Sequence, residues 1–357
     1  MNNSLTHIRL RQEAIMRKRR RSKAIVKSRH KLKRRHSPQP IVRHTWNRPY
    51  IKPIEFVALS SDFRILSNAN VVIKGLDKIS TVRGKRSDIR LLIDMTNVNY
   101  FDLGSLTCLL STLRFCKNYY GNEPINPSCK KYFEESGFLN WMRDLNGRKF
   151  IQTSSNNLIF EKGTDKTSNR KVGEEIRKAI KYLTKQEGTF PPVYSIIQEI
   201  CPNSIEHANK QTGHKNWMMG IRYESDKVCF AMCDKGSGIL KTLKRKNASQ
   251  YIGDKFNDDI TILHRAFEKK YQSATADDNR NKGLPRIKAV SDEGFINNLT
   301  VITNKTLLNL SDNAQSRQLG SNFAGTFYYW EITNNTSVKI YRTKTLNNGS
   351  RVTGSAI

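Results

Sequence analysis

The chain has 357 residues, of which 62 are Lys or Arg and 31 are Asp or Glu, so its formal net charge is +31. Hydrophobic residues make up 37% of the sequence, which predicts a folded protein, and the length predicts two domains. No apolar run approaches the roughly eighteen residues of a membrane span, and no secretory signal is visible, so we expect a cytoplasmic protein. The six cysteines form no CxxC pair and are expected to be reduced packing residues.

The positive charge is concentrated in residues 1–50, which hold 16 Lys and Arg residues and a single acid. Two runs, Arg17–Arg21 and Lys31–Arg35, repel themselves too strongly to pack in a core. The sequence therefore predicts a basic arm that is disordered or only conditionally helical. Nucleic acid is the favoured partner of this arm, because each basic side chain that meets a phosphate releases a counterion. An anionic lipid surface and a merely solvated extension are the alternatives.

Residues 51–155 form the first expected domain, of mixed α/β type. The apolar run 89–95 predicts a short buried strand, and 103–115 carries leucines at helical spacing. Another helix is expected over 128–142. The polar, turn-rich segment 156–171 then predicts a linker or an exposed hairpin.

Residues 172–335 form the second expected domain, and a polar tail follows over 336–357. The domain opens with a predicted helix over 174–186, and Pro191–Pro192 marks the start of the next helix. The other expected elements are strands over 217–223, 227–234, 299–302, 306–310 and 326–332 and an amphipathic helix around 260–267.

Four short signals follow one another in the second domain. Glu199 and Asn203 are four residues apart, so a helix places their carboxylate and amide on one face, where both can converge on a metal ion or water. The loop Asp234–Gly238 follows a strand and offers a hydrogen-bond acceptor with glycines that permit close approach of a ligand. Gly283 opens a helix whose N-terminal amides suit phosphate, and Thr326 begins the last strand.

In this order and on these elements, the four signals resemble the GHKL (Bergerat) nucleotide-binding fold of histidine kinases, DNA gyrase, chaperone ATPases and anti-sigma-factor serine kinases. The resemblance implies a two-layer sandwich of a mixed sheet and helices that binds ATP and Mg²⁺. It implies that Asn203 is the Mg²⁺ ligand and that Glu199 is the catalytic residue, orienting or deprotonating the attacking water or hydroxyl. Asp234 would accept a hydrogen bond from the adenine amino group.

The same resemblance implies further nucleotide contacts. The glycines after Asp234 would let the backbone pass the base, the start of the helix at Gly283 would wrap the phosphates, and Thr326 would support the base. Our own addition is positive charge near the phosphates from His207, Arg280 and Lys282. The full set of expected nucleotide-binding residues is Asn203, His207, Asp234, Gly236, Gly238, Arg280, Lys282, Gly283, Leu284 and Thr326.

The first domain is similar, along Leu91–Leu106, to the STAS fold of anti-anti-sigma factors. The similarity implies a smaller α/β domain that binds a protein partner. In that family a phosphorylated serine usually follows the aspartate that Asp102 matches, but Leu103 stands at that position here and Ser105 is offset from it. A generic α/β scaffold is the alternative.

These expectations describe a cytoplasmic α/β (α+β) regulatory protein that binds ATP and Mg²⁺. The leading interpretation is an ATPase or a serine/threonine protein kinase of the anti-sigma type. A non-catalytic ATP-gated binding module and a nucleic-acid-binding protein acting through its arm are the alternatives. Homodimer formation is left open.

Overall fold

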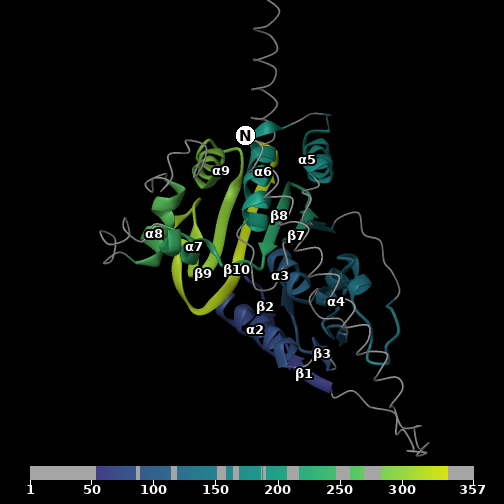
Figure 1. Cartoon of the computed structure of the whole chain (residues 1–357). Coiled ribbons are helices and arrows are strands. Elements are labelled where there is room, and N and C mark those ends of the chain that lie inside the picture. The colour runs from purple at the N-terminus through teal and green to yellow at the C-terminus, as the bar shows by residue number, and fades with distance from the viewer. Residues whose placement is uncertain are drawn as a thin grey trace, which may run out of the picture. The chain divides into compact units, whose positions relative to one another are not determined.

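The computed structural model describes residues 54–85, 89–113, 119–150, 158–163, 169–185, 187, 190–206, 217–246, 258–268 and 283–336. The basic arm and the tail beyond residue 336 lie outside these ranges. The described elements fall within one compact unit, Lys52–Ile357, and are mixed α/β with both parallel and antiparallel sheets (Figure 1). Within the described ranges, no helix is both long and apolar enough to cross a membrane.

The described residues between 54 and 150 are called the N-terminal half here, and those between 158 and 336 the C-terminal half. A three-stranded parallel sheet in the order β1-β3-β5 organises the N-terminal half. Its strands are β1 (Ile54–Ala58), β3 (Arg90–Asp94) and β5 (Tyr119–Gly121). Parallel neighbours need long crossover connections, which here contain α2 (Ala69–Lys85) and α3 (Leu103–Leu113). The strand expected over 89–95 is confirmed as Arg90–Asp94, and the helix expected over 103–115 is confirmed as far as Leu113, where the described range ends.

The remaining elements of this half are short. The strands β2 (Asp62–Phe63) and β4 (Tyr100–Phe101) pair with each other in parallel. The single helix expected over 128–142 is divided into α4 (Pro127–Glu135) and η1 (Phe138–Trp141). Gly137 separates them with a left-handed φ of +67°, a conformation that ends helices and favours glycine.

Five strands of the C-terminal half form a second sheet in the order β6-β7-β8-β10-β9. They are β6 (Leu158–Gly163), β7 (Trp217–Tyr223), β8 (Lys227–Asp234), β9 (Asn297–Asn309) and β10 (Arg317–Thr333). Every described pairing is antiparallel, which differs from the mixed sheet that we expected. The short connections between β7 and β8 and between β9 and β10 impose antiparallel hairpins.

Strand β6 lies inside the segment that the sequence predicted as a linker or an exposed hairpin. It pairs along its whole length with β7, from Leu158 opposite Arg222 to Gly163 opposite Trp217. Backbone N–H and C=O groups make this pairing. The strand begins with the short apolar run Leu158–Phe160, whose polar, turn-rich flanks favoured the interpretation as a linker.

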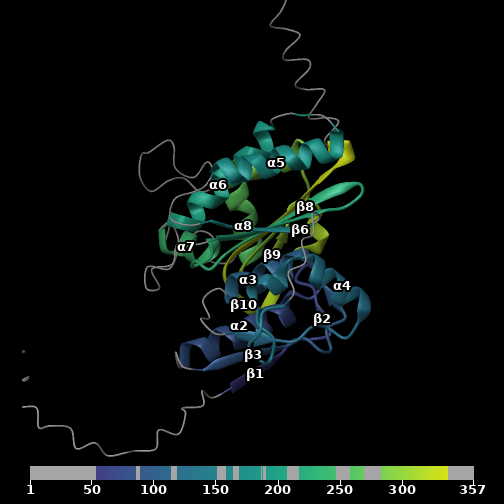
Figure 2. The ribbon, with the colours of Figure 1, turned by 90° about the vertical axis from the view of Figure 1, so that its right-hand side faces the viewer.

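The helices of the C-terminal half are α5 (Asn169–Thr184), α6 (Pro191–Glu206), α7 (Ile239–Lys246), α8 (Asp259–Phe267) and α9 (Gly283–Asp292). Helix α6 begins at Pro191, as expected, and continues through Pro202. Side chains of these helices share a hydrophobic cluster with one face of the five-stranded sheet. Figure 2 shows α5 and α6 on that side and α2 and α3 on the other.

Both faces of the five-stranded sheet are covered. Successive strand residues point to opposite faces, so Trp217 and Met219 pack among the helices of the C-terminal half, whereas Met218 packs in the cluster that contains α2 and α3. This sheet is therefore the middle layer between two sets of helices, and the two expected domains share the hydrophobic core on one of its faces. The five cysteines within the described ranges are all buried and free of disulfides, as expected; they are Cys108, Cys129, Cys201, Cys229 and Cys233.

Candidate nucleotide site

The first group of expected site residues lies where α6 meets α9. Glu199 and Asn203 occupy successive turns of α6, and Gly283, the first residue of α9, lies against both. A Cβ atom built on Gly283 would lie 2.8 Å from Oε2 of Glu199 and 3.4 Å from Nδ2 of Asn203. The start of α9 therefore lies directly against the side chains of Glu199 and Asn203. The prediction that Glu199 and Asn203 share a helix face is confirmed.

A residue that sequence reasoning missed completes this group. Arg286 forms an ion pair with Glu199 in which Nη1 of the guanidinium donates to Oε1 of the carboxylate. The Arg286 side chain is 54% exposed and that of Glu199 is 22% exposed. The sequence could have indicated this residue, because Arg286 is three positions after Gly283 and residues three apart lie on the same face of a helix. Glu199 therefore contacts both the first turn of α9 and a cation that the same helix supplies.

The second group surrounds Asp234, which ends β8 and is only 7% exposed. Its Oδ1 atom accepts hydrogen bonds from the backbone N–H of Gly236, at 2.7 Å, and of Thr326, at 3.1 Å. The expected grouping of Asp234, Gly236 and Thr326 is thus present. Thr326, in the neighbouring strand β10, meets Asp234 through its backbone.

Two left-handed glycines shape the loop that follows Asp234. Gly238 has a φ of +83°, and a Cβ atom there would lie 2.6 Å from Oδ1 of Asn304. Gly325 has a φ of +124°, and a Cβ atom there would lie 2.1 Å from the carbonyl oxygen of Asp234. The positive φ strains any other residue type at both positions, and at Gly325 a side chain would also collide with the backbone of Asp234 and Lys235. The expected glycine requirement at Gly238 thus has a packing reason.

Side chains of β9 anchor the same loop. The backbone N–H of Ile239 donates to Oγ1 of Thr303 at 2.8 Å, and Nδ2 of Asn304 donates to the carbonyl oxygen of Ser237 at 3.2 Å. Sequence reasoning missed Thr303 and Asn304, which are distant in the chain from the loop that they hold. Asn304 has a positive φ of 52°, unusual within a strand.

Of the remaining expected nucleotide-binding residues, the structure describes only Leu284. Leu284 is half-buried, and its side chain packs against the core cluster beneath the helices. It therefore anchors the start of α9. His207, Arg280 and Lys282 lie outside the described residues.

Glu199 and Asn203, which face the start of α9 from α6, are of residue types that fit a Mg²⁺ ion held mainly by phosphate oxygens and water. Asn203 offers an amide and Glu199 a carboxylate on one helix face, both of which supply the oxygen donors that Mg²⁺ prefers. Within the described ranges, no group of three or more His, Cys, Asp or Glu residues could hold a metal ion.

The region around Asp102 has a structural role. Its Oδ1 atom accepts from the backbone N–H of Ser105 at 2.6 Å, and Ser105 Oγ accepts from the N–H of Asp102 at 3.1 Å, which together cap α3. Oδ2 accepts from the N–H of Leu66 at 3.0 Å. Burial raises the pKa of the Asp102 carboxyl, although these backbone hydrogen bonds oppose the rise. Leu103, which stands at the position of the serine that is phosphorylated in anti-anti-sigma factors, is buried.

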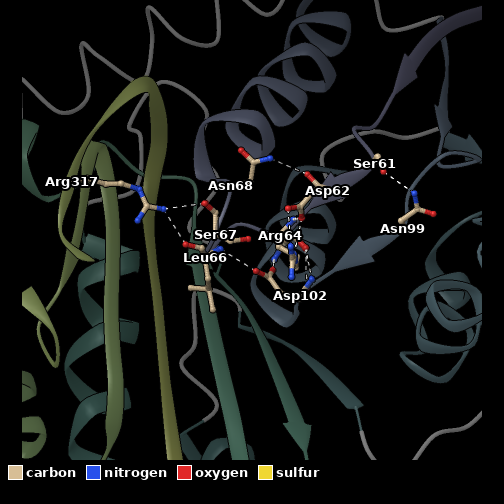
Figure 3. A network of polar contacts seen from close by, with 10 residues as sticks. Ser61, Asp62, Arg64, Leu66, Ser67, Asn68, Asn99, Asp102 and Arg317 are labelled. Atoms are coloured by element: carbon tan, nitrogen blue, oxygen red, sulfur yellow. Dashed lines mark hydrogen bonds and ion pairs between the residues drawn. The ribbon is translucent and has the colours of Figure 1, made fainter. Parts of the chain in front are cut away.

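Figure 3 shows how this region reaches the C-terminal half. Nη2 of Arg317, in β10, donates to the carbonyl oxygens of Leu66 at 3.1 Å and Ser67 at 3.3 Å. Leu66 is the residue whose N–H binds Asp102. One short loop before α2 therefore connects the capped helix α3 to the long strand β10.

No protein-family model matches the chain, and no curated protein matches it.

Proposed function

We propose that this protein binds ATP and Mg²⁺ through residues 172–335 and acts as an ATPase or a serine/threonine protein kinase in regulation. The observation that carries the proposal is the convergence of Glu199, Asn203 and Gly283, which brings a carboxylate and an amide to the first turn of α9. Exposed N–H groups and the helix dipole make such a first turn favourable for phosphate. The arrangement therefore supports a site for the phosphates and Mg²⁺ of a nucleotide.

Each residue has a proposed task. Asn203 binds Mg²⁺ through its amide oxygen, and Glu199 orients or deprotonates the attacking water or hydroxyl. Asp234 accepts a hydrogen bond from the adenine amino group, while the backbone of the loop Asp234–Gly238 passes close to the base. The rigid attachment of this loop to β9 and β10 supports that task, because a fixed acceptor discriminates between bases better than a mobile one.

The test is incubation of the purified chain with labelled ATP and Mg²⁺, with free phosphate and protein-bound label measured separately. Free phosphate alone supports an ATPase, and labelled protein supports a kinase. Glu199→Gln should preserve ATP binding and lower turnover by about 10²- to 10⁴-fold, the usual contribution of a general base.

Glu135→Gln is the matched control, because it removes an exposed carboxylate from another helix, α4. The control should turn over ATP at the wild-type rate. A Glu199→Gln protein that is as active as the control would remove Glu199 from the catalytic role.

A second candidate function is ATP-gated binding without hydrolysis. The observation that favours it is the ion pair with Arg286, which engages the carboxylate that hydrolysis needs. In this case ATP binds, neither free phosphate nor labelled protein accumulates, and Glu199→Gln changes nothing that the assay detects. In both candidate functions we propose that residues 51–155 bind a protein partner. We also propose a cytoplasmic location for both.

A further inference from the structure

Arg286 lies near two anionic positions, the carboxylate of Glu199 and the proposed phosphate site at the first turn of α9. It pairs with Glu199, and Glu199 Oε2 lies 2.8 Å from the position of a Cβ atom on Gly283, at the start of α9. A phosphate bound by this first turn would therefore approach the carboxylate of Glu199. Two anions so close repel each other unless a cation lies between them or moves toward the phosphate.

The geometry allows Arg286 to make that move. Its side chain is 54% exposed, so the ion pair with Glu199 is of the weak, solvent-screened kind. Arg286 and Gly283 lie on the same face of α9, so a rotation of the Arg286 side chain can bring its guanidinium to a phosphate bound at the first turn. Guanidinium groups bind phosphate through two parallel hydrogen bonds, which favours phosphate over a single contact with a carboxylate.

We propose that Arg286 is a positioning residue that holds Glu199 in the nucleotide-free protein and transfers to the β- or γ-phosphate of ATP, thereby releasing Glu199 for the attacking water. This inference rests on the proposed function and adds a regulatory step to it. The exchange makes the carboxylate available only when a nucleotide with more than one phosphate is bound.

The first test compares nucleotide affinities. Arg286→Met should weaken binding of Mg²⁺-ATP by about ten- to a hundred-fold, as expected for loss of a charge-assisted hydrogen bond, and should leave AMP affinity unchanged. Arg286→Lys keeps the positive charge but cannot form the two parallel hydrogen bonds of a guanidinium, so its ATP affinity should lie between those of the wild type and Arg286→Met. Lys288→Met is the matched control, because Lys288 is a cation of the same helix that pairs with Asp292 at 2.6 Å.

The second test measures the exchange itself by a double-mutant cycle. Glu199→Gln, Arg286→Met and the double variant are compared by thermal unfolding with and without saturating Mg²⁺-ATP. In the free protein the two substitutions should be non-additive, because they remove the same ion pair. With ATP bound they should become additive, because Arg286 has left Glu199.

The outcomes separate this inference from the proposed function. If the wild type binds no ATP, the proposed function fails, and this inference fails with it. If the wild type binds ATP but Arg286→Met binds both ATP and AMP normally, only this inference is overturned. Equal weakening of ATP and AMP, or non-additivity that persists with ATP bound, assigns Arg286 a purely structural role and also overturns it. Arg286→Lys decides the question if Arg286→Met does not fold.

Discussion

At the scale of single residues, Asp234 has a structural task in addition to its proposed contact with adenine. Its Oδ1 atom holds the N–H groups of Gly236 and Thr326 and so joins the loop to β10. An asparagine can keep a carbonyl oxygen for those two donors while presenting an NH₂ group in place of the other oxygen. Substitution can therefore separate the structural task from nucleotide recognition.

Asp234→Asn should leave the fold intact and weaken ATP binding by about ten- to a hundred-fold, because adenine then meets a donor where it needs an acceptor. Calorimetric titration with ATP measures the effect. The control is Asp226→Asn, an exposed aspartate in the turn that precedes β8. ATP affinity that stays at the control value in a folded Asp234→Asn protein would reject the adenine assignment.

At the scale of secondary-structure elements, α3 packs against the five-stranded sheet through Gly104. A Cβ atom on Gly104 would lie 2.6 Å from both Ile65 Cγ2 and Phe327 Cζ, and both of these side chains are fully buried. Phe327 directly follows Thr326, whose N–H binds Asp234. The close approach of α3 therefore supports the strand that carries one side of the proposed adenine site.

Gly104→Ala should lower the free energy of unfolding by about 1–3 kcal/mol, because neither buried neighbour has room to retreat. It should also weaken ATP binding through the displacement of β10. Urea denaturation and nucleotide titration measure the two effects. Gly320→Ala is the control, since Gly320 also faces the N-terminal half, but the nearest atom to its Cβ position is Asn70 Oδ1 at 3.8 Å. Equal stability of the two variants would show that this contact does not limit the packing of α3.

At the scale of the whole molecule, the shared core predicts that the C-terminal half does not fold alone. Removal of the N-terminal half would expose the sheet face that carries Met218, Cys229 and Phe327, all of them buried. An exposed apolar face of this kind leads to aggregation or loss of structure. A chain that begins at residue 156 should therefore be insoluble or lack a cooperative thermal transition. A soluble, cooperatively folding fragment with full ATP affinity would contradict this prediction.

The basic arm gives a second prediction at this scale. If residues 1–50 bind nucleic acid through phosphates, the affinity should fall with salt with a log–log slope of about −0.9 per phosphate neutralised on duplex DNA. Deletion of the arm should abolish this binding and leave ATP affinity unchanged, because the described elements begin at Ile54. Fluorescence anisotropy with DNA of two unrelated sequences measures both points. Absence of salt-sensitive binding at low ionic strength would leave lipid or an acidic protein as the partner.

Much of the local structure was predictable because it depends on neighbouring residues. The strands expected over 217–223 and 227–234 coincide with β7 and β8, and Pro191 begins α6 as expected. The face shared by Glu199 and Asn203 follows from helical spacing alone. Strands expected separately over 299–302 and 306–310 are one continuous strand, β9, which pairs with β10 on both sides of register shifts at the polar residues between them.

The sequence by itself determined the basic character of the chain, the position of most helices and strands, and the helix face that Glu199 and Asn203 share. These features depend on charge, on periodicity and on turn residues, which act over a few positions. Only the tertiary structure decided that β6 joins the sheet, that α3 covers its second face and that Arg286 pairs with Glu199, 87 positions away in the chain. Such contacts depend on which surfaces the folded chain brings together, and no local pattern encodes that choice.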